Sequence, residues 1–300
     1  MSAASYEVLV HAGVHCCGAE DFQRFLGANR SALNAAGFDL AYPGRVGAAG
    51  GRFDCALPEP RHNSDDIEAF GGAIASTLAP DFAGGNRLIL SEHDLAGRMA
   101  SLLGGRFYPA ARKRAEALRA ALDQPVDHLV LTIKPYDTLF VSAWRRFALE
   151  RLMEPFAEYA PVMATFAGGW VDTVEALRDG LGARTVTILT ERSDPEDVLT
   201  HLAHDVRLSE PVRPAVMPVI TDSAIAMIQR HYRQGARFAP GQRDRILAFH
   251  ARQPQIRVEH GFAGLQLADL RGRYVADLDA ISRLSGVAVV GNALPAVAAE

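Results

Sequence analysis

Short runs of β-favouring apolar residues alternate along this chain with longer stretches that have the hydrophobic spacing of helices. The runs occupy residues 6–12, 87–91, 127–134 and 184–191. A strand, a helix-length segment and a further strand form a β–α–β unit, and such units build parallel sheets. We therefore predict an α/β fold of three layers, in which helices cover a central, mainly parallel sheet.

The segments between these runs carry helix start and stop signals. Residues 19–37 have Glu20 and Asp21 in the expected first turn, where carboxylates favour the helix dipole, and Gly37 at the end. Segment 43–63 is rich in Gly, Pro and Arg, which predicts a long loop. Further helices are expected at 64–79 (with Ser64 as N-cap), 138–153, 168–180, 195–205, 222–236, 241–252 and 266–285.

The domain organisation is predicted to be simple. No linker-like or charged segment separates two halves, so we expect a single domain over 1–300 with a helical C-terminal layer, subregion 219–300. The short apolar run 287–290 is either one more strand or a docked tail.

Composition excludes several classes of protein. The chain has 300 residues, 49% of them hydrophobic, which is too apolar for a disordered protein. Its formal charge of −4 gives no reason to expect a nucleic-acid partner, and no apolar run reaches the length of a membrane span. With only three cysteines and Glu7 in place of a basic signal region, we expect a cytoplasmic protein.

The turn after the first predicted strand has the layout of a phosphate cradle. Gly13 and Gly18 flank it, and a helix N-terminus follows, so backbone N–H groups converge there. A phosphate loop also needs a Lys and a hydroxyl, but position 16 is Cys, and Glu20 and Asp21 repel anions. The residues alone leave two interpretations open, a phosphate-binding turn and a plain tight connection.

A set of residues around this turn keeps a fixed register: His11, Gly13, Gly18, Gln23, Phe25, Leu26, Asn29, Leu33, Gly37, Tyr42 and Pro43. This register resembles the N-terminal pattern of bacterial sulfotransferase-like proteins, which use 3′-phosphoadenosine-5′-phosphosulfate (PAPS). That pattern reads H-x-G-x-x-K-T-G-[ST]-[ST]-x-x-Q, followed by FL-x-x-N-x-x-x-L-x-x-x-G and a Tyr-Pro. The chain departs from it where the family's Lys, Thr and hydroxyl pair fall on Cys16, Cys17, Ala19 and Glu20.

The resemblance implies a P-loop-type fold and a site for PAPS as co-substrate. It assigns the 5′-phosphosulfate to the turn residues Gly13, Val14, His15, Cys16, Cys17, Gly18 and Ala19.

A second part of the resemblance lies after the strand 127–134. That strand ends in Lys134, Pro135 follows, and Ser142 stands eight residues after Lys134. In the family an Arg and a Ser at this spacing bind the 3′-phosphate of the nucleotide, so the resemblance implies that role for Lys134 and Ser142. Lys keeps the charge but lacks the bidentate fork of Arg. Without the family, a strand-end Lys and a buried Ser is the simpler interpretation.

Candidate catalytic residues follow the strand 87–91. Glu92 matches a family Glu that lies near the sulfuryl group and acts as base, and His93 is an alternative base. His15 is the nearest substitute for the missing Lys charge. The competing interpretation is that Ser91 or Asp94 caps the next helix and Glu92 is solvated.

The function implied by the resemblance is transfer of a sulfuryl group from PAPS to a hydroxyl or amine of a small molecule or saccharide. The alternative is a non-catalytic binding or structural protein that kept the fold but lost phosphosulfate chemistry. A third hypothesis is an enzyme with a different donor that uses the Cys16–Cys17 pair. A helix N-terminus would lower the thiol pKa of this pair, but Glu20 and Asp21 oppose that shift.

Two further groups of residues could form a metal site and an anion-binding surface. The set His11, His15, Cys16, Cys17, Cys55 and His62 has none of the usual metal-ligand spacings, so we predict no metal site. Basic residues cluster on a predicted helix, where they form a solvated face or attract an anionic ligand: Arg112, Lys113, Arg114 and Arg119, with Arg145 and Arg146 on another helix.

Overall fold

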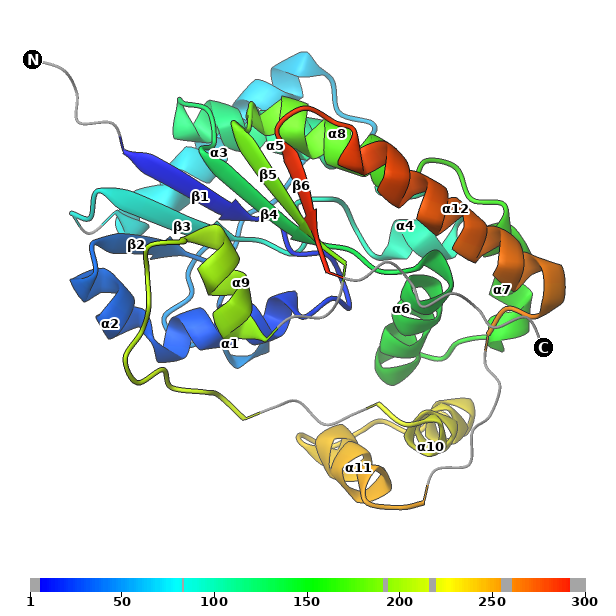
Figure 1. Ribbon diagram of the computed structural model, residues 1–300. Coiled ribbons are helices and arrows are strands. Elements are labelled where there is room, and N and C mark those ends of the chain that lie inside the picture. The colour runs from blue at the N-terminus through cyan, green and yellow to red at the C-terminus, as the bar shows by residue number, and fades with distance from the viewer. Residues whose placement is uncertain (1–5, 83, 191–193, 216–219, 255–260, 292–300) are drawn as a thin grey trace, which may run out of the picture.

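The computed structural model describes residues 6–82, 84–190, 194–215, 220–254 and 261–291. Their strands form one sheet in the order β2-β3-β1-β4-β5-β6, in which every neighbouring pair is parallel (Figure 1). The strands are β1 (Glu7–His11), β2 (Phe38–Ala41), β3 (Arg87–Ser91), β4 (His128–Thr132), β5 (Thr185–Leu189) and β6 (Val287–Val290). The predicted three-layer α/β fold is confirmed.

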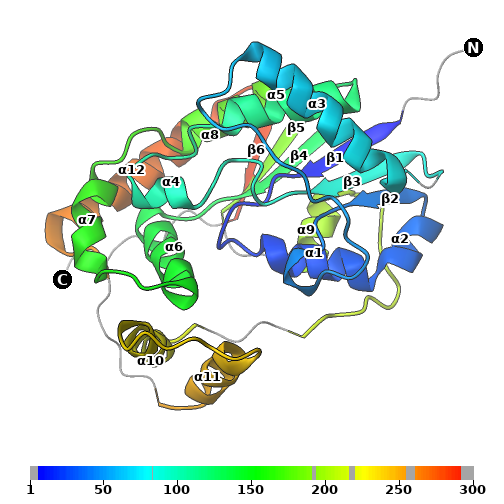
Figure 2. The same cartoon turned by 180° about the vertical axis from the view of Figure 1, so that it is seen from behind.

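Helices cover both faces of the sheet, as Figures 1 and 2 show from opposite sides. One face carries α1 (Ala19–Ala28), α2 (Arg30–Ala35) and α9 (Pro195–Leu202). The other carries α3 (Ser64–Leu78), α5 (Ala111–Leu122), α8 (Trp170–Leu181) and α12 (Gly264–Ser282).

The apolar run 8–10 in the middle of β1 follows from this double cover. Successive side chains of a strand point to opposite faces. Val8 and Val10 enter the core beneath α5 and α8, whereas Leu9 packs with Phe22 and Phe25 of α1. Both faces of the strand therefore have to be apolar, which is typical of a parallel sheet.

The remaining helices lie beyond the carboxyl ends of the strands. They are α4 (Ala100–Leu103), α6 (Tyr136–Glu150), α7 (Phe156–Ala164), α10 (Asp222–Arg233) and α11 (Gln242–Ala251), with 3₁₀ turns η1 (Arg45–Gly47) and η2 (Ala79–Asp81). α10 packs against α6 and α11, and α12 reaches from α8 to α6. Position 219, where the predicted C-terminal subregion begins, and residue 191 of the predicted fourth strand lie outside the described residues. Within the described ranges, no helix is long and apolar enough to cross a membrane.

Several local predictions are wrong in detail. The strand β2 was not expected, because its four residues are too few for a clear pattern and include the buried Asp39. The helix expected at 19–37 is divided at Asn29 into α1 and α2. The N-cap of α3 is Asn63 rather than Ser64, since the Asn63 side chain accepts from the Asp66 N–H in a capping box. The run 287–290 is a strand.

The order of the strands creates a switch point between β1 and β3. These strands are neighbours, yet the chain leaves β1 toward α1 on one face and leaves β3 toward α5 on the other. In open α/β sheets, ligands bind outside the carboxyl ends of the strands at such a point. The segments that follow β1 and β3 are therefore the first place to look for a site.

Candidate functional site

The turn after β1 packs directly against the segment that follows β3. Gly13 has φ +62°, and a Cβ placed on it would lie 2.4 Å from the Cα of His93. Only a glycine permits this approach, because any side chain would collide with the backbone of the neighbouring segment. The contact brings residues 13–18 and residues 92–94 into one site.

The turn leads into α1 through a left-handed N-cap, Gly18, with φ +95°. Within the turn, the Cys17 N–H donates to the Val14 carbonyl at 3.2 Å. The first N–H groups of a helix have no carbonyl partner within it and can hold an anion. Glu20 does not oppose this with a free charge, since its carboxylate pairs with Arg146 of α6 at 2.9 Å.

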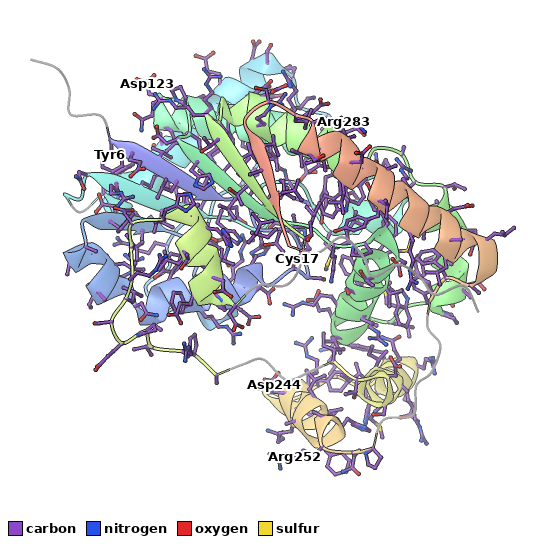
Figure 3. All side chains as sticks on the ribbon, viewed as in Figure 1. Tyr6, Cys17, Asp123, Asp244, Arg252 and Arg283 are labelled. Atoms are coloured by element: carbon purple, nitrogen blue, oxygen red, sulfur yellow. The ribbon has the colours of Figure 1, made fainter. Side chains whose placement is uncertain are left out.

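Lys134, which follows β4, contacts both the turn 13–19 and its predicted partner Ser142. Its Nζ donates to the Cys16 carbonyl oxygen at 2.8 Å and to Ser142 Oγ at 3.1 Å. Ser142 lies on α6, and its hydroxyl donates to the Thr138 carbonyl at 2.6 Å. The predicted Lys134–Ser142 pair therefore meets, and it contacts the turn. In Figure 3, the label of Cys17 marks this turn at the carboxyl-terminal edge of the sheet.

Glu92 is buried rather than solvated, being 2% exposed. Arg45, from the loop between β2 and α3, binds both of its carboxylate oxygens through Nη2, at 2.6 Å and 2.7 Å. The Asp94 N–H also donates to it, at 2.8 Å. Burial raises the pKa of Glu92 to about 7, although Arg45 acts to lower it. Arg45 lies in a segment without a recognisable motif, so the sequence alone does not indicate its role.

Asp94 does not cap a helix, because α4 begins only at Ala100. Its Oδ1 lies 2.8 Å from His15 Nε2, and its Oδ2 accepts from Arg45 Nη1 at 2.9 Å. Burial alone would raise the pKa of Asp94, but His15, His93 and Arg45 together hold it below the ordinary value. Since an ionised carboxylate only accepts hydrogen bonds, we assign the proton of this contact to His15 Nε2.

His93 lies beside His15 and is buried. Its ring packs edge-on against the His15 ring with centroids 5.5 Å apart, and its Nδ1 lies 3.4 Å from Gln23 Oε1. Burial, followed by the nearby His15, lowers the pKa of His93 to about 4. The imidazole is therefore neutral at neutral pH. The three predicted catalytic residues, Glu92, His93 and His15, are thus brought together.

The residues considered for a metal in the sequence analysis do not form one cluster. His11 lies inside β1 and contacts Ser91 Oγ at 3.0 Å, and His62 Nδ1 accepts from the Glu59 N–H at 2.8 Å. A different set, His15, His93 and Asp94, offers ligand atoms within 4.8 Å of one another. Those residues could hold a divalent cation. The Arg45 guanidinium bound to Asp94 opposes cation binding there, because it carries the same charge as the ion. The absence of a metal site remains a prediction.

The predictions for the basic clusters need correction, and the hypothesis of a reactive cysteine pair loses support. Arg114 is buried instead of solvated, and it pairs with Glu59 at 2.8 Å and donates to the Asp94 carbonyl. Arg145 pairs with Asp222 of α10. Desolvation raises the pKa of the Cys16 thiol despite Lys134 and Arg146, which disfavours the hypothesis of a reactive cysteine pair.

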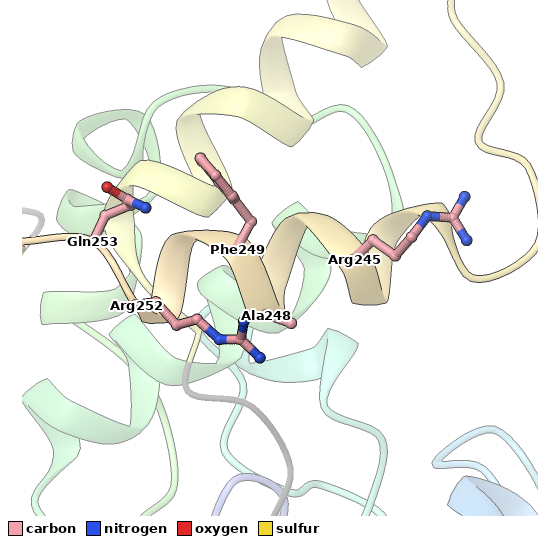
Figure 4. A pocket seen from close by; sticks show the side chains of 5 residues that line it. All are labelled: Arg245, Ala248, Phe249, Arg252 and Gln253. Carbon is pink, nitrogen blue, oxygen red and sulfur yellow. The ribbon is translucent and has the colours of Figure 1, made fainter.

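A separate hollow lies on the outer helix α11, away from the ends of the strands (Figures 3 and 4). It is lined by Arg245, Ala248, Phe249, Arg252 and Gln253. None of these side chains is a nucleophile or a carboxylate, so its lining offers no acid–base pair.

The site after β1, β3 and β4 combines helix-start N–H groups, a lysine next to a hydroxyl, and a carboxylate–imidazole pair. Such an arrangement can bind an anion and accept a proton from a nearby hydroxyl. Comparisons of the chain with protein-family models, with curated proteins and with solved structures each find no match.

Proposed function

We propose that this chain binds PAPS at the carboxyl ends of β1, β3 and β4 and transfers its sulfuryl group to a hydroxyl or amine of a small molecule or saccharide. The observation that carries the proposal is the double contact of Lys134, which donates to Ser142 Oγ and to the Cys16 carbonyl. The Lys134 ammonium group thereby contacts both Ser142, its proposed partner in binding the 3′-phosphate, and the turn proposed to bind the phosphosulfate.

In this proposal the turn 13–19 holds the phosphosulfate through its backbone N–H groups, and Lys134 and Ser142 hold the 3′-phosphate. Arg146 supports anion binding because it neutralises Glu20 at the start of α1. Lys134 also compensates in part for the missing lysine at position 16, since its ammonium group reaches the backbone of that residue.

The His15–Asp94 pair is the proposed proton acceptor. Asp94 fixes the His15 ring and holds the proton on Nε2, which leaves Nδ1 as an acceptor. The acceptor hydroxyl gives its proton to Nδ1 while its oxygen forms the new bond to sulfur. The bond from sulfur to the 5′-phosphate oxygen breaks, and that oxygen keeps the electron pair, so adenosine 3′,5′-bisphosphate leaves.

Glu92 is a weaker candidate for this step than the sequence resemblance implies. Both of its oxygens are held by Arg45, and the residue is almost fully buried. We therefore propose that Glu92 positions Arg45 and the segment 92–94, and that His93 supports the His15 ring.

The rival function, non-catalytic nucleotide binding, is favoured by Cys16 at the position where the family has its lysine. The charge that develops on the leaving phosphate would then lack its usual partner. Transfer of labelled sulfate from PAPS to a panel of hydroxyl and amine acceptors separates the two functions. The enzyme should label at least one acceptor, and His15→Ala should abolish that labelling while PAPS still binds. Binding of PAPS without labelling of any acceptor would favour the rival function.

A further inference from the structure

Tyr108, between β3 and α5, lies beside the turn and has no role in the function proposed above. The residue is 2% exposed, and its ring stacks on the His15 ring with centroids 6.1 Å apart and planes inclined by 16°. Phe107 and Trp170 pack around the same ring. The phenol is therefore fixed against the turn by aromatic neighbours on several sides.

Two buried polar groups on these facing rings have unused hydrogen-bonding capacity. Across the residues that the structure describes, His15 Nδ1 has no hydrogen-bond partner, and the hydroxyl hydrogen of Tyr108 has no acceptor. The phenol oxygen faces the His15 backbone N–H, which can only donate to it and leaves the Tyr108 O–H unused. Buried polar atoms are nearly always paired in folded proteins, and an unpaired one is costly. Two such groups lie on stacked rings, and one of the rings belongs to the turn of the proposed anion site. This pairing points to a ligand that completes both hydrogen bonds.

The backbone of Tyr108 is held in a conformation that a tyrosine rarely adopts. Its φ is +43°, although it precedes Pro109, and residues before proline favour extended conformations. Gly97 packs against it so closely that a Cβ on Gly97 would lie 3.0 Å from the tyrosine ring. Strain of this kind collects at binding and catalytic sites, where the surrounding packing maintains it.

We infer that Tyr108 Oη donates a hydrogen bond to an oxygen of the sulfuryl group, and that His15 Nδ1 faces the incoming hydroxyl beside it. The inference rests on the proposed function for the identity of the ligand. The Tyr108 hydroxyl can donate to an oxygen of the tetrahedral sulfuryl group. His15 Nδ1, beside it, can accept the hydrogen bond of the hydroxyl that attacks this group. Burial, with Cys17, Cys16 and Asp94 nearby, holds the pKa of Tyr108 well above its ordinary value, so the phenol remains a donor.

The test is Tyr108→Phe, which removes only the unpaired hydroxyl. Calorimetry compares PAPS, which carries the sulfuryl group, with adenosine 3′,5′-bisphosphate, which lacks it. We expect the variant to bind PAPS about 10- to 100-fold more weakly, the loss typical of one hydrogen bond to a charged group, and to bind the bisphosphate as the wild type does. Its melting temperature should equal or exceed that of the wild type, because an unsatisfied buried hydroxyl is gone.

Tyr232→Phe is the matched control, since Tyr232 Oη on α10 donates to the Leu149 carbonyl at 3.0 Å. It should lower the melting temperature slightly and leave both affinities unchanged. Equal PAPS affinity of Tyr108→Phe and the wild type would overturn the inference alone. A variant that loses both ligands and melts lower would show that Tyr108 is structural. If wild-type protein binds neither ligand, the inference and the proposed function both fail.

Discussion

Lys134 Nζ lies 2.8 Å from the carbonyl oxygen of Cys16, so a cation from the end of β4 contacts the one turn residue whose side chain lacks the charge expected there. The lysine and the turn are 118 residues apart in sequence and meet only because β4 is the neighbour of β1 in the sheet. This contact links the strand order to the proposed chemistry.

Placing a lysine at position 16 of the turn should increase the rate of the proposed sulfuryl transfer. In Cys16→Lys, an ammonium group on the turn itself would stabilise the leaving phosphate, and such a donor is worth about 100-fold in rate. The left-handed φ of Cys16, +63°, strains either side chain in a similar way. The measurement is the initial rate of labelled-sulfate transfer from PAPS.

Cys16→Met is the matched control for that variant, because it lengthens the side chain without a charge. A gain in rate shared by both variants would contradict an electrostatic cause, as would a folded Cys16→Lys protein with no gain.

Arg45 should matter for stability mainly because it pairs with Glu92. Removing one partner of a buried ion pair leaves a charge uncompensated and costs about 3 kcal/mol, the lower end of the usual range, since Arg45 itself is partly exposed. Arg45→Ala should therefore lower the free energy of unfolding in urea. The double variant Arg45→Ala/Glu92→Gln should recover much of the loss, and a double variant as unstable as the single one would argue against this pairing.

The sequence predicts the elements of this fold better than the contacts between them. Buried strands such as β1 and β4 are recognisable because both of their faces are covered, which gives continuous apolar runs. The strand β2 was missed because four residues with a polar Asp39 give no such run. Asp39 is tolerated there because the Tyr6 hydroxyl donates to it at 2.6 Å.

Much of the candidate site was predictable because its residues follow strands, whereas Ser142, on α6, was expected from the family resemblance alone. Glu92, His93 and Lys134 stand at strand ends, and the parallel topology gathers such positions at one edge. Arg45 and Tyr108 lie in irregular segments, where no periodicity indicates which way a side chain points. Their roles depend on tertiary contacts, namely the ion pairs of Arg45 with Glu92 and Asp94 and the stacking of Tyr108 on His15.

Acid should destabilise the protein through His11. Burial lowers the pKa of His11 to about 3, below the ordinary value of about 6.5. Between these values the unfolded chain binds a proton that the folded chain does not, so stability falls as pH falls through this window. Between pH 7 and pH 4.5, this difference in proton binding lowers the free energy of unfolding by about 2.5 kcal/mol.

The variant His11→Asn tests this effect, because it keeps a polar group near Ser91 Oγ but cannot titrate. The loss of unfolding free energy between pH 7 and pH 4.5 should be smaller in the variant than in the wild type, as measured by urea titration at both pH values. An equal loss in the two proteins would mean that His11 does not contribute.

The most direct test of the account is calorimetric titration of adenosine 3′,5′-bisphosphate into wild-type protein and Lys134→Met, which removes the charge and keeps much of the side-chain length. We predict weak, salt-sensitive binding by the wild type, weakened by about 1.5–3 kcal/mol in the variant, the usual range for a charged hydrogen bond. Adenosine 5′-monophosphate, which lacks the 3′-phosphate, should lose less affinity in the variant than the bisphosphate does, because only the 5′-phosphate near the turn then feels the lost charge. No binding at millimolar bisphosphate, or equal binding by folded wild-type and Lys134→Met proteins, would contradict the proposed role of Lys134 and with it the site.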